Sequence, residues 1–217
     1  MSQDQEGQKE NAFAALRKFT RKRPPVERCE MCSRALFSEH EHLIEPAGHR
    51  LVCACEACAV LFDGQAGAKY KRVPCAAYFL ENFAMSVSQW ESLRIPIEMA
   101  FFFKSSSQGR VIALYPSPAG TVESLLPLET WNGIVGANPI LREMQEDVMA
   151  LLANRVRTNG SPQEYYLVPI DQCYRLVGLI RSHWRGLSGG TEVWREIGAF
   201  FDGLKRRADV RPEIEHV

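Results

Sequence analysis

The chain has 217 residues, enough for one large core or for a small module joined to a domain of ordinary size, and we favour the second. Hydrophobic residues make up 46% and charged residues 24%, which excludes a wholly disordered chain. Lys and Arg together number 26, as do Asp and Glu, so no net charge directs the protein to nucleic acid or to an anionic membrane.

Two further features predict a cytoplasmic protein. The longest apolar runs, such as residues 99–103 and 148–153, are far too short to cross a bilayer. The first ten residues are polar and lack the apolar core region of a signal peptide. In a reducing compartment, clustered cysteines more often hold a metal than form disulfides.

Residues 1–25 predict a basic N-terminal segment whose first ten residues are disordered. Phe13, Leu16 and Phe19 recur every three residues among Lys and Arg, which indicates a short amphipathic helix. Pro24 and Pro25 end it, because proline lacks the N–H group and the φ freedom that a helix needs. The segment is either a docking element for an acidic protein, a membrane surface or a nucleic acid, or a solvated helix and linker.

Residues 26–72 predict a metal-binding module. Cys29 and Cys32 form one Cys-x-x-Cys pair, Cys55 and Cys58 form a second, and 22 residues separate the pairs. In this pattern each pair forms a tight turn and the two turns face one ion. Tetrahedral sulfur ligation favours one zinc ion, with one iron ion as the alternative. We expect a zinc-ribbon or rubredoxin-like module in which short strands close over the ion.

Additional ligand candidates lie inside this module. His40, His42 and His49 lie between the cysteine pairs and could replace a thiolate or form a second site. Cys53 precedes Cys55 by two residues, so on a strand both side chains would face the same side. Cys53 is therefore a buried spare thiol, a thiol beside the ligands, or a ligand itself. We retain Cys53 and His42 as candidates for an additional metal site.

Residues 73–217 predict an α+β domain with an antiparallel sheet covered by C-terminal helices. Apolar patterns and turn residues indicate five strands, at residues 98–104, 110–115, 121–126, 148–156 and 165–170. Short helical pieces are expected at residues 88–93, 127–135 and 139–144. Asp171 is expected to cap a helix that ends before Gly186, and a last helix begins near Thr191. Cys75 and Cys173 are expected to be inert core thiols.

The second domain carries a candidate partner surface but no catalytic motif. It lacks a nucleophile elbow, a His-Glu-x-x-His motif and a dinucleotide fingerprint, which argues against an enzyme. Arg181, Trp184 and Arg185 lie together near the end of the first C-terminal helix. Trp and Arg are the residue types expected at a protein-binding hot spot.

From about residue 26 onwards the chain resembles an uncharacterised bacterial family whose genes often lie beside those of uptake nickel-iron hydrogenases. The matching segments are CEMC (29–32), HLI (42–44), LVCACEAC (51–58), ALYPSPAG (113–120), VPID (168–171) and residues 174–190. The resemblance implies a context of hydrogenase maturation, assembly or electron transfer, and it assigns no catalytic residue.

Three functions follow from these features. The first is an accessory or assembly protein, stapled by zinc, that binds a hydrogenase subunit or maturation factor. The second is a rubredoxin-like one-electron carrier, although Ser33 and Ala59 stand where glycine commonly follows such cysteine pairs. The third is a nucleic-acid-binding zinc ribbon, which the neutral overall charge disfavours.

Overall fold

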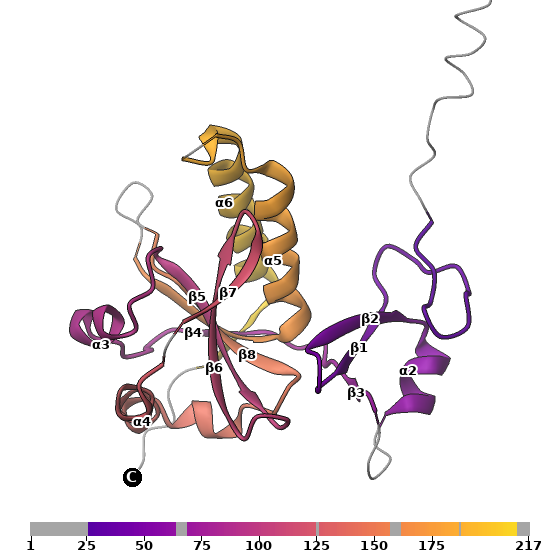
Figure 1. Cartoon of the computed structure of the whole chain (residues 1–217), viewed down its shortest axis with the longest axis horizontal. Coiled ribbons are helices and arrows are strands. Elements are labelled where there is room, and N and C mark those ends of the chain that lie inside the picture. The colour runs from indigo at the N-terminus through magenta and orange to yellow at the C-terminus, as the bar shows by residue number, and fades with distance from the viewer. Residues whose placement is uncertain (1–25, 64–68, 125, 157–161, 187, 212–217) are drawn as a thin grey trace, which may run out of the picture.

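The computed structural model describes residues 26–63, 69–124, 126–156, 162–186 and 188–211. Within them the chain forms a three-stranded sheet and a seven-stranded sheet (Figure 1). This is the predicted α+β class, with antiparallel pairing in both sheets and long helices at the C-terminal end. The basic segment at residues 1–25 and its expected helix lie outside the described residues.

The small sheet is a hairpin with one added strand and a helix. Strands β1 (Glu41–Glu45) and β2 (Arg50–Ala54) pair antiparallel, and β3 (Lys71–Arg72) pairs antiparallel with β1. Helix α2 (Glu56–Phe62) follows β2, so the module contains a helix besides the expected short strands. The chain turns into this helix directly after Cys55, so residues 56–62 do not pair with a strand of the small sheet.

The two faces of the hairpin enter different cores. Leu43 pairs with Val52, and both are fully buried in a small cluster with Cys29, Cys55 and Cys58. Ile44 pairs with Leu51 on the opposite face, and Ile44 is fully buried in the core of the large sheet. Side chains alternate along a strand, so a single hairpin serves both cores.

The large sheet has the strand order β10-β4-β9-β8-β5-β6-β7. Its strands are β4 (Tyr78–Leu80), β5 (Met99–Ser105), β6 (Arg110–Ser117), β7 (Gly120–Ser124), β8 (Met149–Asn154), β9 (Glu164–Pro169) and β10 (Asp209–Arg211). The five expected strands are present, and all pairs are antiparallel except that of β10 with β4. Strands β4 and β10 were not expected, because three residues are too few to show a period of two.

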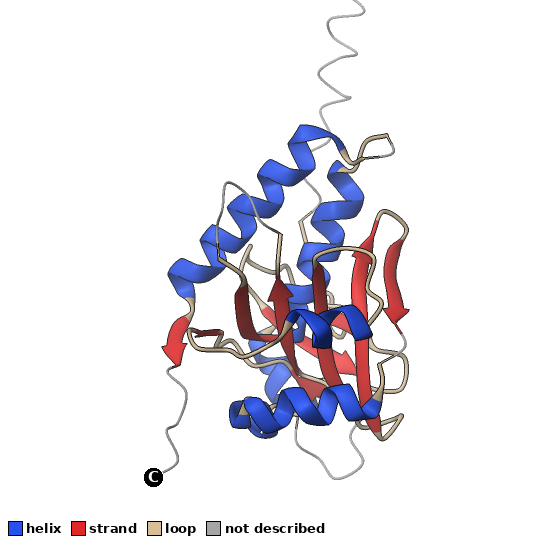
Figure 2. Ribbon diagram, turned by 90° about the vertical axis from the view of Figure 1, so that its left-hand side faces the viewer, coloured by secondary structure: helices blue, strands red, loops and turns tan. Residues whose placement is uncertain are grey.

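Helices cover both faces of the large sheet (Figure 2). They are α3 (Val87–Ser92), α4 (Leu128–Ala137), the 3₁₀ helix η1 (Pro139–Glu143), α5 (Ile170–His183) and α6 (Gly190–Arg207). On β5, the Phe101 ring lies 6.1 Å from that of Tyr174 on α5, and the Phe102 ring lies 5.7 Å from that of Trp131 on α4. Neighbouring strand residues point to opposite faces, which explains why Met99 to Phe103 are all buried.

Polar contacts also connect the small sheet to the large one. Lys71 of β3 forms an ion pair with Asp147, whose side chain is fully buried. His49 Nε2 lies 3.2 Å from Ser105 Oγ, and the His49 ring packs on its edge against Phe103 at 5.2 Å. The division of the chain into segments 26–72 and 73–217 stays a prediction, because residues 49 and 71 of the first segment contact residues 105 and 147 of the second.

Candidate metal centre

The first cysteine pair lies on a tight turn that precedes β1. The Cys29 amide donates to the Arg34 carbonyl, and the Ser33 amide donates to the Cys29 carbonyl, both at 2.8 Å. Ser33 has φ 63°, a left-handed conformation that glycine adopts without strain and other residues adopt at a penalty of roughly 1–2 kcal/mol. The serine therefore takes the conformation of the glycine that commonly stands there.

The second cysteine pair lies at the start of a helix rather than in a turn between strands. Cys55 is the N-cap residue of α2, and Cys58 lies in its first turn. Residues three apart on a helix share one side, so the two sulfurs can approach one point. Ala59 is helical and needs no left-handed conformation, which is why glycine is not required after this pair.

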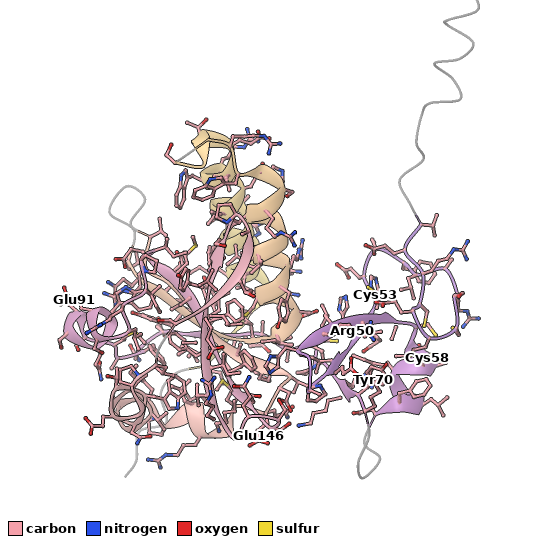
Figure 3. All side chains as sticks on the ribbon, viewed as in Figure 1. Arg50, Cys53, Cys58, Tyr70, Glu91 and Glu146 are labelled. Atoms are coloured by element: carbon pink, nitrogen blue, oxygen red, sulfur yellow. The ribbon has the colours of Figure 1, made fainter. Side chains whose placement is uncertain are left out.

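The two pairs meet at one point in space. The four sulfurs lie within 4.8 Å of one another, and the sulfurs of Cys32 and Cys55 lie 3.7 Å apart. A zinc ion with four sulfurs at about 2.3 Å places them about 3.8 Å from one another, so this separation fits a tetrahedral site. In Figure 3, Cys53 and Cys58 lie in the part of the protein built from β1, β2 and α2, far from Glu91.

The four thiols have different affinities for their protons. Burial raises the pKa of Cys29, but amide N–H groups of Cys55, Cys32 and Met31 donate to its sulfur and together lower the pKa to about 6. Burial, hydrogen bonds with the other sulfurs and the negative charge on Cys29 raise the pKa of Cys58 to about 12. Four thiolates packed this closely need a cation to ionise together, and a dication supplies that charge.

Three of the four cysteines of the cluster are buried and one is exposed. Cys29, Cys58 and Cys55 are 1%, 8% and 9% exposed, while Cys32 is exposed. The buried apolar side chains around them are few, namely Leu43, Val52, Ala54 and Ala59, and the partly buried Met31, Leu36 and Tyr70 pack against them. Four cysteines complete a closed tetrahedral shell, which is the arrangement of a structural ion rather than of one that binds substrate.

Cys53 does not join this cluster. It is the cross-strand partner of His42, so its side chain lies on the opposite face of the hairpin from the small core. There the Cys53 sulfur and one ring nitrogen each of His40 and His42 lie within 4.8 Å of one another. Burial raises the pKa of the Cys53 thiol, and the carboxylates of Glu30 and Glu27 raise it further.

Asp171 has a different role from the expected one. Pro169 stands at the N-cap of α5, and the Asp171 carboxylate lies in the first turn, where its Oδ2 is 3.0 Å from His42 Nδ1. Asp171 therefore holds a histidine of the hairpin instead of capping its own helix. This contact forms only when α5 docks against the hairpin, so the sequence pattern of the helix alone does not predict it.

The candidate partner residues gather at the C-terminal end of α5. The Trp184 indole N–H donates to the Gly186 carbonyl at 2.9 Å, and Arg185 Nη1 donates to the Ser182 and Trp184 carbonyls. Arg181 and Arg185 are exposed and Trp184 is half-buried. The structure brings these residues together, and their role in binding stays a prediction.

The two remaining cysteines differ from each other. Cys173 is fully buried on α5, and burial raises its pKa well above the ordinary value, which agrees with an inert core thiol. Cys75 is exposed, so the expectation of a core position was wrong. Cys75 follows Pro74 in the segment between β3 and β4, where the chain crosses the surface from one sheet to the other.

Two further polar residues, His40 and Asp147, have contacts that the sequence signals weakly or not at all. His40 was one of three histidines in the module, and the signal that it pairs with His42 is their spacing of two, the period of a strand. Asp147 gave no signal, because its partners Lys71 and Ser106 are distant in sequence.

Comparison with known proteins gives a family but no characterised relative. No curated protein and no solved structure matches the chain. Among the described residues, no helix combines the length and the apolar character needed to span a membrane. One family model matches residues 28–208, which include both cysteine pairs and all strands of the large sheet except β10. The chain therefore belongs to the family of unknown function DUF5947.

Proposed function

We propose that this protein is a non-enzymatic accessory or assembly protein whose four-cysteine module is stapled by one zinc ion and which binds a component of a nickel-iron hydrogenase system. The observation that carries the proposal is the closed four-sulfur cluster, with a separation of 3.7 Å between Cys32 and Cys55. Four protein ligands leave no position for a substrate. The hydrogenase context comes from the sequence resemblance, with a subunit or maturation factor as the partner.

The module carries exposed apolar side chains that suit a partner protein. Val60, Leu61 and Phe62 on α2 are 60%, 62% and 38% exposed, and Phe37 is 87% exposed. Neighbouring exposed apolar residues of this kind mark interaction sites more often than isolated ones do. We assign the partner to this helix, with the residues Arg181, Trp184 and Arg185 at the end of α5 as a second contact region.

The metal part of the proposal is tested on the full chain by elemental analysis of protein purified without oxygen from a related host. One zinc per chain is expected. Cys29→Ser and Cys55→Ser should lose zinc and solubility, because the small core depends on the ion for much of its folding free energy. Cys75→Ser is the matched control, since this cysteine is exposed and lies outside the cluster. Normal folding of the two cluster variants without metal would contradict the structural role.

The partner part is tested with separately purified hydrogenase subunits and maturation factors. The zinc-loaded protein should bind one of them, and Leu61→Asp should weaken that binding at least about tenfold, as expected for an apolar contact residue. Val87→Asp is the control, because Val87 is 59% exposed on α3 and belongs to a different surface. Absence of binding to every component would contradict the hydrogenase assignment and leave the zinc result intact.

One observation favours the electron-carrier alternative. Cys32 is exposed, so an iron ion at the cluster would have one ligand at the surface, through which an electron could pass to a partner. Amide N–H groups also point at the Cys29 sulfur, and such bonds tune the reduction potential of iron–thiolate sites. One iron per chain with a reversible potential would establish this function, and a redox-silent zinc protein would exclude it.

A further inference from the structure

A second cluster of metal-binding side chains lies on the face of the hairpin that looks away from the four cysteines. His40 directly precedes β1 and His42 is the second residue of that strand, and Cys53 on β2 pairs with His42 in the register of the hairpin. The ring centroids of the two histidines are 4.7 Å apart. Their ligand atoms and the Cys53 sulfur lie within 4.8 Å of one another.

Hydrogen bonds fix which nitrogen of each ring is available. His40 Nδ1 lies 3.0 Å from the Phe37 carbonyl oxygen, and His42 Nδ1 lies 3.0 Å from a carboxylate oxygen of Asp171. Both oxygens only accept, so each Nδ1 carries the proton and each Nε2 of the neutral ring keeps its lone pair. A carbonyl or carboxylate that orients Nδ1–H is the usual companion of a histidine that binds metal through Nε2.

The strongest sign of a missing ligand is on His40. Its side chain is only 8% exposed, and its Nε2 atom is buried without a hydrogen-bond partner among the described residues. A buried polar atom left unpaired costs about 1–3 kcal/mol, and native proteins seldom retain one. A cation bound to that lone pair removes the penalty.

The surroundings leave room for a fourth ligand. Among the described residues, no fourth His, Cys, Asp or Glu joins the three. The nearby groove of about 660 Å³ is lined by His40 and by Cys55 of the first cluster, whereas His42 and Cys53 do not line it. Three protein ligands with one open position are typical of zinc sites that bind water or an exogenous group. This arrangement differs from the four-cysteine cluster, where the protein fills every position.

We propose that His40, His42 and Cys53 form a second metal site for a divalent ion of the zinc type, with Asp171 as the residue that positions His42 and with the fourth coordination position left to water or an exogenous ligand. Two imidazoles and one thiolate suit zinc and its spectroscopic substitute cobalt, and they disfavour magnesium and calcium, which require oxygen ligands. The proposal is independent of the hydrogenase assignment.

The test is a titration of the full chain with Co²⁺ after one equivalent of Zn²⁺ has filled the four-cysteine cluster. Wild type should take up about one further Co²⁺ per chain, with visible bands and a near-ultraviolet band of a cobalt–thiolate bond. Cys53→Ser should lose the thiolate band, and Cys75→Ser should keep it. His40→Gln and His42→Gln should weaken Co²⁺ binding at least about tenfold, whereas His49→Gln should leave it unchanged.

Asp171→Asn tests the positioning role. The amide keeps the shape of the side chain but loses its charge, so Co²⁺ affinity should fall by about 10–100-fold while the cobalt spectrum keeps its thiolate band. Zinc content is measured on every variant, because loss of zinc from Cys53→Ser would make Cys53 a ligand of the first cluster and overturn the proposal. Wild-type protein that takes up no second metal ion, whether Co²⁺ or Zn²⁺, would also overturn it, whatever the folding of the variants.

Discussion

Replacing Lys71 with methionine is expected to lower the free energy of unfolding by about 2–3 kcal/mol, because it leaves a buried carboxylate without its counter-charge. Lys71 lies on β3 of the small sheet, and its ammonium group contacts Asp147, which precedes β8 of the large sheet. Asp147 also accepts hydrogen bonds from the amide and hydroxyl of Ser106. The carboxylate therefore joins three segments of the chain.

The size of the effect follows from the burial of each partner. Removing one member of a fully buried ion pair costs about 3–5 kcal/mol. The Asp147 side chain is fully buried, but that of Lys71 is 39% exposed, so water near the ammonium group weakens the pair and lowers the expected value. Asp147→Asn should cost less, because it removes the buried charge and an amide oxygen can still accept from Ser106. Asparagine also tolerates φ 68° at this position.

The assay is urea unfolding of the zinc-loaded chain, followed by tryptophan fluorescence, for both single variants and the double variant. The double variant should recover about 0.5–3 kcal/mol relative to the sum of the single effects, since the two side chains are coupled. Arg110→Met is the matched control. Arg110 pairs with Glu123 on the same sheet, but both are about half exposed, so the loss should be about 0–1 kcal/mol. A loss for Lys71→Met no larger than this control, or absence of coupling, would refute the reasoning.

The pH dependence of stability in the same variants independently tests the direction of the Asp147 pKa shift. Burial by itself raises the pKa of Asp147, but Lys71 and the two hydrogen bonds from Ser106 outweigh it, so the folded pKa lies below the ordinary 3.8. A carboxyl with a depressed folded pKa adds stability above its unfolded pKa and loses it as pH falls through the folded value. The stability difference between wild type and Asp147→Asn should therefore be constant near neutral pH and shrink only below about pH 4. Zinc release in acid should be the same for both proteins, because Asp147 lies outside both clusters of candidate metal ligands, so comparing them isolates the carboxylate.

Three more outcomes follow from individual residues. Gly189→Ala should lower the free energy of unfolding by about 1–3 kcal/mol, because Gly189 has φ 85° and a Cβ there would lie 2.8 Å from Val193. The control Gly178→Ala on α5 should not destabilise, because a Cβ at Gly178 would meet nothing within 4 Å. Asn138→Ala should cost about 2–3 kcal/mol in urea unfolding, because Asn138 is 2% exposed and its amide bonds both the N–H and the carbonyl of Ala84. Zinc transfer to a chromophoric chelator should become faster as pH falls, because protons compete with zinc for the thiolates, and equal rates at neutral pH and at about pH 5 would contradict thiolate ligation.

The sequence predicted those parts of the fold whose signals are local. The continuous apolar run at residues 99–103 and the glycine-containing turn after it predicted the β5–β6 hairpin, and the cysteine spacing predicted the four members of the cluster. The turn at Ser33 and the helix at Cys55 were harder to predict, since a Cys-x-x-Cys pair fits either conformation. The contact between His42 and Asp171 had no local signal at all, because two elements far apart in sequence must first dock.

The β1–β2 hairpin connects the two cysteine-containing clusters. Glu30 lies between Cys29 and Cys32, its amide donates to the Cys53 carbonyl, and its carboxylate accepts from the Cys53 amide, both at 2.9 Å. An ion that orders the first cysteine turn therefore also fixes the backbone of Cys53. The register matters equally, because a slip of one residue would move Cys53 and His42 to the other face of the hairpin. The dependence runs in one direction, since the four-cysteine cluster is complete without either histidine, whereas the second cluster needs the backbone that the first one holds in place.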